Sequence, residues 1–108
     1  MEHNLDPVVT AFTEGIAKEL GARLKEVWLF GSRARGDHSV DSDYDVVVVA
    51  DGDEEELHNL VTEKSYAIMC AYDALVGALE YDPFIWAREK KTSLGRNILR
   101  EGIKLYGT

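Results

Sequence analysis

The sequence has few of the features that stabilise secreted proteins or anchor a chain in a membrane. Its single cysteine, Cys70, cannot form an internal disulfide, and only two prolines occur among its 108 residues. No apolar run approaches the length of about 20 residues that a membrane-spanning helix needs, and no basic segment followed by an apolar run opens the chain. These absences predict a protein of the reducing cytoplasm that has no membrane partner.

Basic residues are also scarce. The chain has 12 Lys and Arg against 20 Asp and Glu, which gives a formal net charge of −8. This balance argues against a nucleic-acid backbone as the main substrate. We find no internal repeat, low-complexity tract or linker, and the length suits one domain with an ordinary core and no second domain. We therefore expect a single domain over residues 1–108 that works with a partner.

Helices and strands are predicted to alternate along the chain. Asp6 and Pro7 are typical of a helix start, apolar residues then recur at helical spacing, and Gly21 is expected to end this first helix. A second helix is predicted to begin at the acidic run 53–56 and to include Leu75, with Gly77 closing it. Two further strands are predicted, an apolar central strand at 27–30 and a strand at 79–87 with Pro83 at an edge or bulge. A last helix is predicted to be capped by Thr92 or Ser93 and ended by Gly102. Residues 103–106 are expected to form an extended tail or a short strand.

Two aspartates lie at the start of a valine-rich strand. The run at 46–49 predicts a strand from Ser42 to Ala50 that is buried on both faces. Side chains alternate along a strand, so Asp43 and Asp45 share a face and Tyr44 points away. Two such charges about 4–5 Å apart repel by roughly 3–4 kcal/mol at an effective dielectric near 20. A divalent cation would compensate them, and hard carboxylate oxygens suit Mg²⁺ or Mn²⁺.

A glycine-serine turn follows the predicted strand at 27–30. Gly31 allows close approach of the backbone to a ligand, and a following helix start would direct backbone N–H groups and the Ser32 hydroxyl at an anion. Arg33 and Arg35 are placed to neutralise phosphate charge. The turn is therefore predicted to bind the phosphates of a nucleotide, and the two aspartates the metal ions that accompany them.

These motifs, G-S-R-A-R-G at 31–36, S-D-Y-D-V-V at 42–47 and N-I-L-R-E-G-I-K-L-Y-G at 97–107, resemble those of minimal nucleotidyltransferases in the DNA polymerase β-like superfamily. The resemblance covers nearly the whole chain. It implies an α/β (α+β) fold in which a small mixed sheet is covered by helices, in the order α-β-α-β-α-β-α with a short second helix. It also implies Mg²⁺-dependent transfer of a nucleoside monophosphate, with ATP as the expected substrate, and release of pyrophosphate.

The resemblance further implies a third carboxylate on a later strand, three residues before a proline. Glu80 occupies the matching position before Pro83, where the family usually has aspartate, and Asp82 is a rival. The implied catalytic and metal-binding residues are thus Asp43, Asp45 and Glu80. The nucleotide-binding residues it implies are Gly31, Ser32, Arg33 and Arg35.

Proteins of this kind are commonly paired with a small helical HEPN-type toxin, and the resemblance implies an antitoxin that attaches AMP to a tyrosine of that toxin. Two alternatives stay open. One is an adenylyltransferase for a small molecule such as an aminoglycoside, and the other is a nucleotide-binding module that sequesters a toxin without catalysis. Homo-oligomers and hetero-oligomers are both compatible with the sequence.

Overall fold

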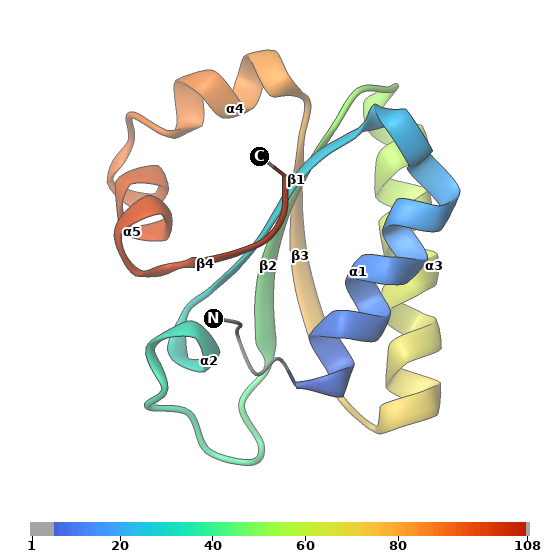
Figure 1. Ribbon diagram of the computed structural model, residues 1–108, viewed down its shortest axis with the longest axis vertical. Helices are drawn as coiled ribbons and strands as arrows, with labels where there is room; N and C mark the ends of the chain where they lie inside the picture. The colour runs from blue at the N-terminus through green and yellow to red at the C-terminus, as the bar shows by residue number, and fades with distance from the viewer. Residues whose placement is uncertain (1–5, 108) are drawn as a thin grey trace.

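A four-stranded mixed sheet forms the centre of the computed structural model, which describes residues 6–107 (Figure 1). The strand order is β3-β2-β1-β4, with β2 and β3 parallel and the other pairs antiparallel. The strands are β1 (Leu24–Phe30), β2 (Tyr44–Ala50), β3 (Val76–Tyr81) and β4 (Ile103–Tyr106). The predicted mixed α/β fold is confirmed, with the chain end 103–106 as a fourth strand.

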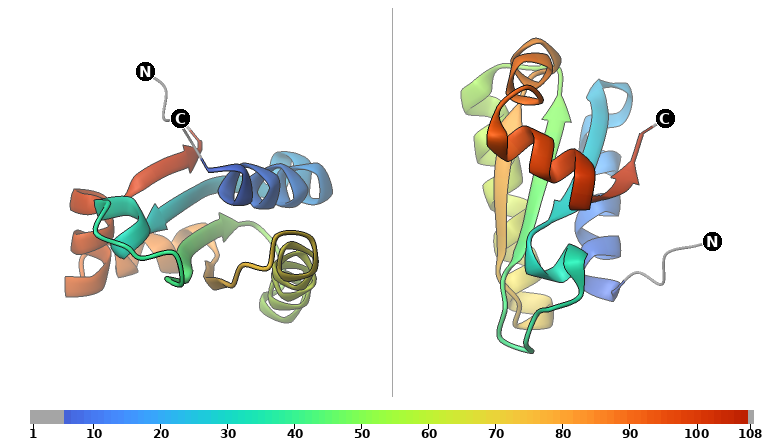
Figure 2. Two further views of the ribbon diagram at one scale, coloured as in Figure 1. Left: turned by 90° about the horizontal axis from the view of Figure 1, so that it is seen from below. Right: turned by 90° about the vertical axis from the view of Figure 1, so that its left-hand side faces the viewer.

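Helices cover both faces of this sheet (Figures 1 and 2). One face carries two long helices, α1 (Pro7–Leu20) and α3 (Glu54–Tyr72). The other face carries α4 (Pro83–Glu89) and α5 (Ser93–Glu101), and the short α2 (Ser32–Arg35) follows the end of β1. A 3-10 turn at Gly21–Arg23 joins α1 to β1. Every helix among residues 6–107 is too short or too polar to cross a lipid bilayer.

Side-chain caps explain where several helices begin. The Asp6 carboxylate accepts a hydrogen bond from Val8 N at 2.8 Å. The Asp53 carboxylate accepts from the first turn of α3, and Thr92 Oγ1 accepts from Gly95 N at 3.1 Å. Each cap satisfies backbone donors that have no partner within the helix, and such a cap typically contributes about 1 kcal/mol. The predicted ends of α1 at Gly21 and of α5 at Gly102 are confirmed.

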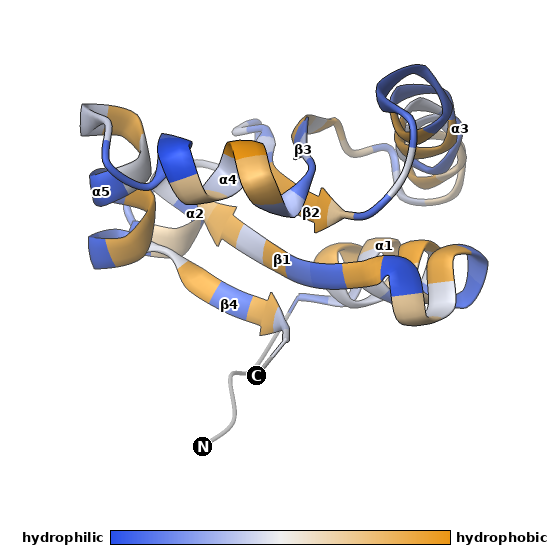
Figure 3. Ribbon diagram, turned by 90° about the horizontal axis from the view of Figure 1, so that it is seen from above, coloured by the Kyte–Doolittle hydropathy of each residue, from blue (hydrophilic) through white to orange (hydrophobic). Residues whose placement is uncertain are grey.

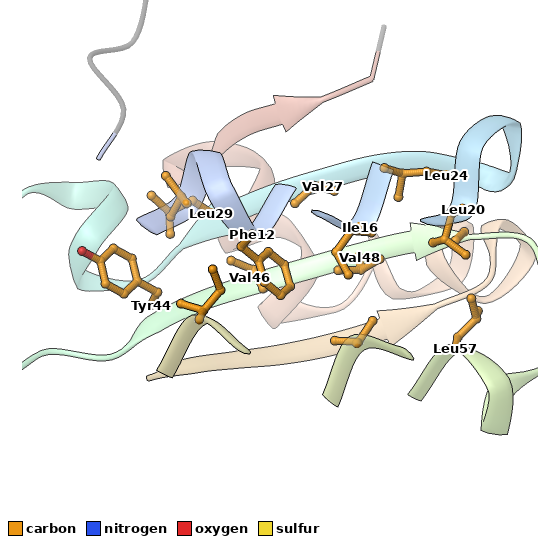
Figure 4. Close-up of a cluster of buried hydrophobic side chains, with 14 of the residues drawn as sticks. Phe12, Ile16, Leu20, Leu24, Val27, Leu29, Tyr44, Val46, Val48 and Leu57 are labelled. Atoms are coloured by element: carbon orange, nitrogen blue, oxygen red, sulfur yellow. The ribbon is translucent and has the colours of Figure 1, made fainter. Parts of the chain in front are cut away.

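The strand β2 divides the core into two layers. Val46 and Val48 pack with Phe12 and Ile16 of α1 (Figure 4). Their neighbours Val47 and Val49 point the other way and pack with Trp86 and Ile98 of the α4–α5 layer. Alternate residues of β2 thus face opposite helix layers, and the prediction of a strand buried on both faces is confirmed. Figure 3 shows the hydrophobic residues along the central strands. Full burial of such a side chain contributes about 1.5–3 kcal/mol.

Several predicted boundaries are wrong. Strand β1 begins at Leu24 rather than at residue 27. Strand β2 begins at Tyr44 rather than Ser42, so Asp43 precedes it. Helix α3 ends at Tyr72, where Asp73 adopts the left-handed conformation with φ 55°, and both Leu75 and Gly77 lie outside the helix.

The predicted strand at 79–87 is a further error. Strand β3 ends at Tyr81, and Asp82 accepts a hydrogen bond from Ile85 N at 2.7 Å as the N-cap of α4. Pro83 occupies the first turn of this helix, where a missing N–H costs nothing. The Asp-Pro pair is therefore a helix start, and Asp82, the rival of Glu80 as a ligand, is a helix cap and not a strand residue.

Candidate active site

Gly31 forms the turn between β1 and α2. Its φ of 78° and ψ of −158° lie in a region that favours glycine, and its carbonyl accepts hydrogen bonds from Ala34 N and Arg35 N. Because Ser32 begins α2, the first N–H groups of this helix have no intrahelical partner. A side chain at position 31 would collide with Oδ2 of Asp45. The turn and the Asp45 carboxylate are therefore in direct contact.

Asp45 pairs with Phe30 across the β1–β2 ladder, which places it beside the end of β1. By strand alternation it shares a face with Val47 and Val49, so it points toward the side of the sheet that α4 and α5 cover. Burial raises the pKa of Asp45, the negative charge of Asp43 raises it further, and Arg35 lowers it. The structure thus brings the two aspartates close enough to repel each other, next to the Gly31 turn.

Arg33 and Arg35 lie two positions apart on α2 and have different environments. Only 12% of the Arg33 side chain is exposed. Its guanidinium donates to the carbonyls of Ser42 and Val40 at 3.1–3.3 Å and lies 4.1 Å above the centre of the Tyr44 ring. These contacts hold the loop between α2 and β2. The guanidinium of Arg33, which was predicted to bind phosphate, is therefore engaged with the protein's own loop.

Arg35 is the arginine on the aspartate side of α2. It lowers the pKa of Asp45, and it forms ion pairs with Asp37 at 3.1 Å and with Glu101 of α5 at 3.5 Å. Its side chain is 43% exposed. Of the two predicted phosphate-binding arginines, Arg35 is the one whose charge reaches the site.

Replacing Arg35 with glutamine is expected to move the acidic limb of the pH–activity profile to higher pH. Arg35 favours the ionised form of Asp45, so its removal raises the pKa of Asp45 further. The lost ion pairs are exposed to solvent and contribute little to stability, so the melting temperature should change little. Lys25→Gln, which removes a comparable exposed pair with Asp51 at 3.5 Å, is the control. If the acidic limb of the variant coincides with that of the wild type, Arg35 does not favour the ionised form of Asp45 during catalysis.

Glu80 does not join the aspartate pair. It pairs with Val48 in the β2–β3 ladder, three residues beyond the pairing of Asp45 with Gly77, and Val48 faces the α1–α3 layer. Its Oε1 lies 3.1 Å from Nδ1 of His58 in α3. The carboxylate is thus on the opposite face of the sheet from Asp45. The prediction that Glu80 supplies the third ligand is corrected accordingly.

Position 77 is the place on β3 that does adjoin Asp45. Gly77 is paired with Asp45 in the parallel ladder and is exposed. A Cβ atom there would lie 3.8 Å from Oδ1 of Asp45. The site is therefore open toward the β3 edge of the sheet, because the residue on that side has no side chain. Nothing in the sequence reveals this, since the pairing register between distant strands decides it.

A second feature that sequence reasoning missed holds the loop before Asp43. The Tyr44 hydroxyl donates a short hydrogen bond to the Asp6 carboxylate, while Arg33 stacks on the Tyr44 ring. Burial, followed by the bond to Asp6, raises the pKa of Tyr44 to about 12, so the hydroxyl stays protonated and remains a donor. The start of α1 is thereby joined to the start of β2 at Tyr44, the residue between Asp43 and Asp45.

The sequence of residues 13–105 matches the family described as nucleotidyltransferase domain. The match covers most of the chain, so the chain belongs to this family, and the predicted class of enzyme, a nucleotidyltransferase, is confirmed. The resemblance to nucleotidyltransferases and the mixed α/β fold that it implies are confirmed as well.

More particular relatives are also found. A Methanocaldococcus jannaschii protein, MJ0604, provisionally named a protein adenylyltransferase, is 29% identical over 95% of this chain and 99% of its own length. A toxin-antitoxin crystal structure with AMP-PNP superposes with a TM-score of 0.63 at 23% identity, covering 90% of this chain and 72% of that one. A tri-AMPylated Shewanella oneidensis HEPN toxin in complex with its MNT antitoxin gives 0.56 at 21% identity, with coverage of 94% and 73%. These structures share the fold of the chain.

Proposed function

We propose that this protein transfers AMP from ATP, with Mg²⁺ or Mn²⁺, to a hydroxyl of a protein acceptor, and that it acts as the antitoxin partner of a HEPN-type toxin. The observation that carries this proposal is the contact between the Gly31 turn and the Asp45 carboxylate, with Asp43 close by. A phosphate-binding turn and two metal ligands are thus adjacent. The names of the similar proteins, a protein adenylyltransferase and an AMPylated HEPN toxin with its antitoxin, support the choice of nucleotide and acceptor.

The donor set suits a divalent cation. Asp43 and Asp45 offer hard oxygen atoms, and the raised pKa of Asp45 reflects charge repulsion and burial that a cation would relieve. Asp43 and Asp45 would hold the ion, and a bound Mg²⁺ supplies neutralisation of phosphate charge. With Glu80 on the other face, these two aspartates are the proposed ligands.

Phosphate binding is assigned to the turn. The first N–H groups of α2 and the Ser32 hydroxyl would donate to the β- and γ-phosphates, and Arg35 would add positive charge beside them. Gly31 permits this approach because it has no side chain between the backbone and the ligand. Arg33 links α2 to the loop before β2 through its hydrogen bonds to the carbonyl of Ser42.

The strand order then favours one side for the acceptor. In an in-line displacement the new bond between the acceptor oxygen and the α-phosphorus forms opposite the bond to pyrophosphate that breaks. If pyrophosphate leaves toward the turn at the end of β1, the hydroxyl enters from the other side of Asp45, where β3 lies. Gly77 occupies that side and leaves room for a large acceptor side chain.

The decisive experiment incubates the purified protein and Mg²⁺ with ATP labelled at the α- or the γ-position in a lysate of its own host, beside an Asp43→Asn variant. We expect label from the α-position alone on a discrete protein, and none with the variant. Label on a small molecule instead would favour the aminoglycoside-type alternative. ATP binding without transfer to any fraction would favour the sequestering module and reject the proposed enzyme.

A further inference from the structure

Positive charge is concentrated in the last quarter of the chain. Residues 83–106 contain six of the 12 Lys and Arg but only two of the 20 Asp and Glu, so they carry a formal charge of +4 and the rest of the chain carries −12. This segment comprises α4, α5 and β4. The net charge of −8 is therefore unevenly distributed, and residues 83–106 form a basic segment that the overall composition does not reveal.

Most cations of the α4–α5 segment differ in their pairing from the cations elsewhere. On the rest of the molecule, Arg23, Lys25 and Lys64 form ion pairs with acids of the same chain at 3.1–3.5 Å. Within residues 6–107, no ion pair involves Arg88, Lys90, Lys91 or Arg96 of the α4–α5 segment, whereas Arg100 of α5 pairs with Glu101 at 3.4 Å. Three of these four residues are exposed. Their charge is therefore available to a partner.

Large apolar side chains accompany these cations. Phe84 is 71% exposed, and Ile85, Leu94 and Leu99 are 37–42% exposed, although the same helices bury Trp86 against the sheet. Figure 3 shows hydrophobic and strongly hydrophilic residues next to one another on α4 and α5. Single exposed apolar residues are ordinary, but a set of them on two short helices, bordered by unpaired cations, has the composition of an interaction surface.

The α4–α5 surface, defined by Phe84, Arg88, Lys91, Leu94 and Arg96, belongs to a helix layer that reaches the candidate active site at Glu101. Helix α5 is joined to α2 by the ion pair between Arg35 and Glu101. Both helices also cover the sheet face toward which Asp45 points (Figure 2). A macromolecule bound to the α4–α5 surface would therefore lie on the same face of the sheet as the Asp45 carboxylate.

We propose that the α4–α5 surface docks the protein acceptor through an acidic region that also presents apolar side chains. The identity of this partner as the acceptor rests on the proposed function. Its acidic chemistry follows from the unpaired cations, and its apolar component from Phe84 and Leu94. The acidic α1–α3 layer does not prevent such docking, because the Debye length is about 10 Å at 0.1 M salt, whereas the molecule measures 34 × 29 × 24 Å.

A nucleic acid would satisfy the cations but would leave the aliphatic part of the surface without a matching partner. Recognition of single strands uses aromatic rings on which bases stack, and Phe84 is the one exposed aromatic residue of α4 and α5. A protein surface matches both the charges and the apolar residues. We therefore argue for the protein, and RNA becomes an outcome of the test.

The test compares two variants with equal changes in charge. Lys91→Glu/Arg96→Glu reverses the α4–α5 surface, and Lys18→Glu/Lys64→Glu reverses two cations of the α1–α3 layer as the matched control. Binding of fluorescent poly(Glu,Tyr), an acidic polypeptide with hydroxyl groups, is measured by anisotropy beside an oligouridine. Melting temperature and ATP affinity verify that both variants remain folded.

We expect the wild type and the control to bind poly(Glu,Tyr), and the Lys91→Glu/Arg96→Glu variant to bind it about tenfold more weakly. Added salt should reduce this difference in affinity. Equal affinities of the two variants would overturn the proposal, and tighter binding of oligouridine would assign the surface to nucleic acid instead. Incubation with α-labelled ATP separates the two levels of inference. Binding of the copolymer without label on it supports the surface and counts against the acceptor chemistry, whereas label that the reversal leaves unchanged refutes the surface.

Discussion

Replacing Asp45 with asparagine is expected to reduce AMP transfer by about a thousandfold or more, because it removes a proposed metal ligand that also adjoins the phosphate-binding turn. The neutral amide keeps the shape of the side chain, so the contact with Gly31 is preserved in outline. Release of pyrophosphate and appearance of α-labelled protein are the measurements. Asp41→Asn, which neutralises an exposed aspartate in the loop before β2, should retain activity.

The same substitution is expected to leave stability unchanged or to increase it at neutral pH in the absence of Mg²⁺. Burial, followed by the charge of Asp43, raises the pKa of Asp45 above its unfolded value. Protonated Asp45 therefore favours folding below the unfolded pKa, and this contribution is lost as pH rises through the folded pKa. At pH 7 the ionised carboxylate opposes folding, and asparagine removes that penalty.

Thermal melts of the wild type and Asp45→Asn across a pH series check this expectation. The two melting temperatures should converge below about pH 4, near the ordinary pKa of aspartate, where both side chains are neutral. If the variant instead melts several degrees lower at pH 7, Asp45 stabilises the fold, and the loss of activity would no longer identify it as a metal ligand.

Local sequence patterns predicted the parts of the site that local structure determines. The strand that runs into Gly31 and the valine-rich strand that contains Asp45 were predicted because a glycine turn and side-chain alternation need no distant information, although the start of the second strand was placed two residues too early. The choice between Arg33 and Arg35 was harder. Residues two apart on a helix point to different sides, so only one of them reaches Asp45, and the sequence does not say which side of α2 faces the sheet.

Pairing between distant segments determined what the sequence did not reveal. The resemblance implied Glu80 as a ligand because it occupies the family's position before the proline, but its face depends on the register of β3 against β2. A shift of one residue in that register would reverse the face of every side chain. The same register puts Gly77 beside Asp45. The Asp82-Pro83 pair permitted both a bulged strand and a helix start, and the capping bond to Ile85 N decides for the helix.

Replacing Gly77 with valine is expected to lower transfer of AMP to a protein acceptor about a hundredfold while leaving ATP binding close to that of the wild type. A Cβ atom at this position lies 3.8 Å from Oδ1 of Asp45, and the further methyl groups of valine fill the space through which we propose that the acceptor hydroxyl enters. The fold should tolerate the change, since Gly77 is an exposed residue within β3, and valine favours strands.

A graded series makes the steric origin of this effect testable. Gly77→Ala adds only the Cβ atom in ordinary contact with Asp45, so it should reduce protein transfer less than valine does. Water is a smaller nucleophile than a protein side chain, so slow hydrolysis of ATP to AMP and pyrophosphate should survive in both variants. Hydrolysis and transfer that fall together would indicate a disturbed Asp45 instead of a blocked entrance. Full protein transfer by a folded Gly77→Val variant would show that the acceptor approaches from another side of the sheet.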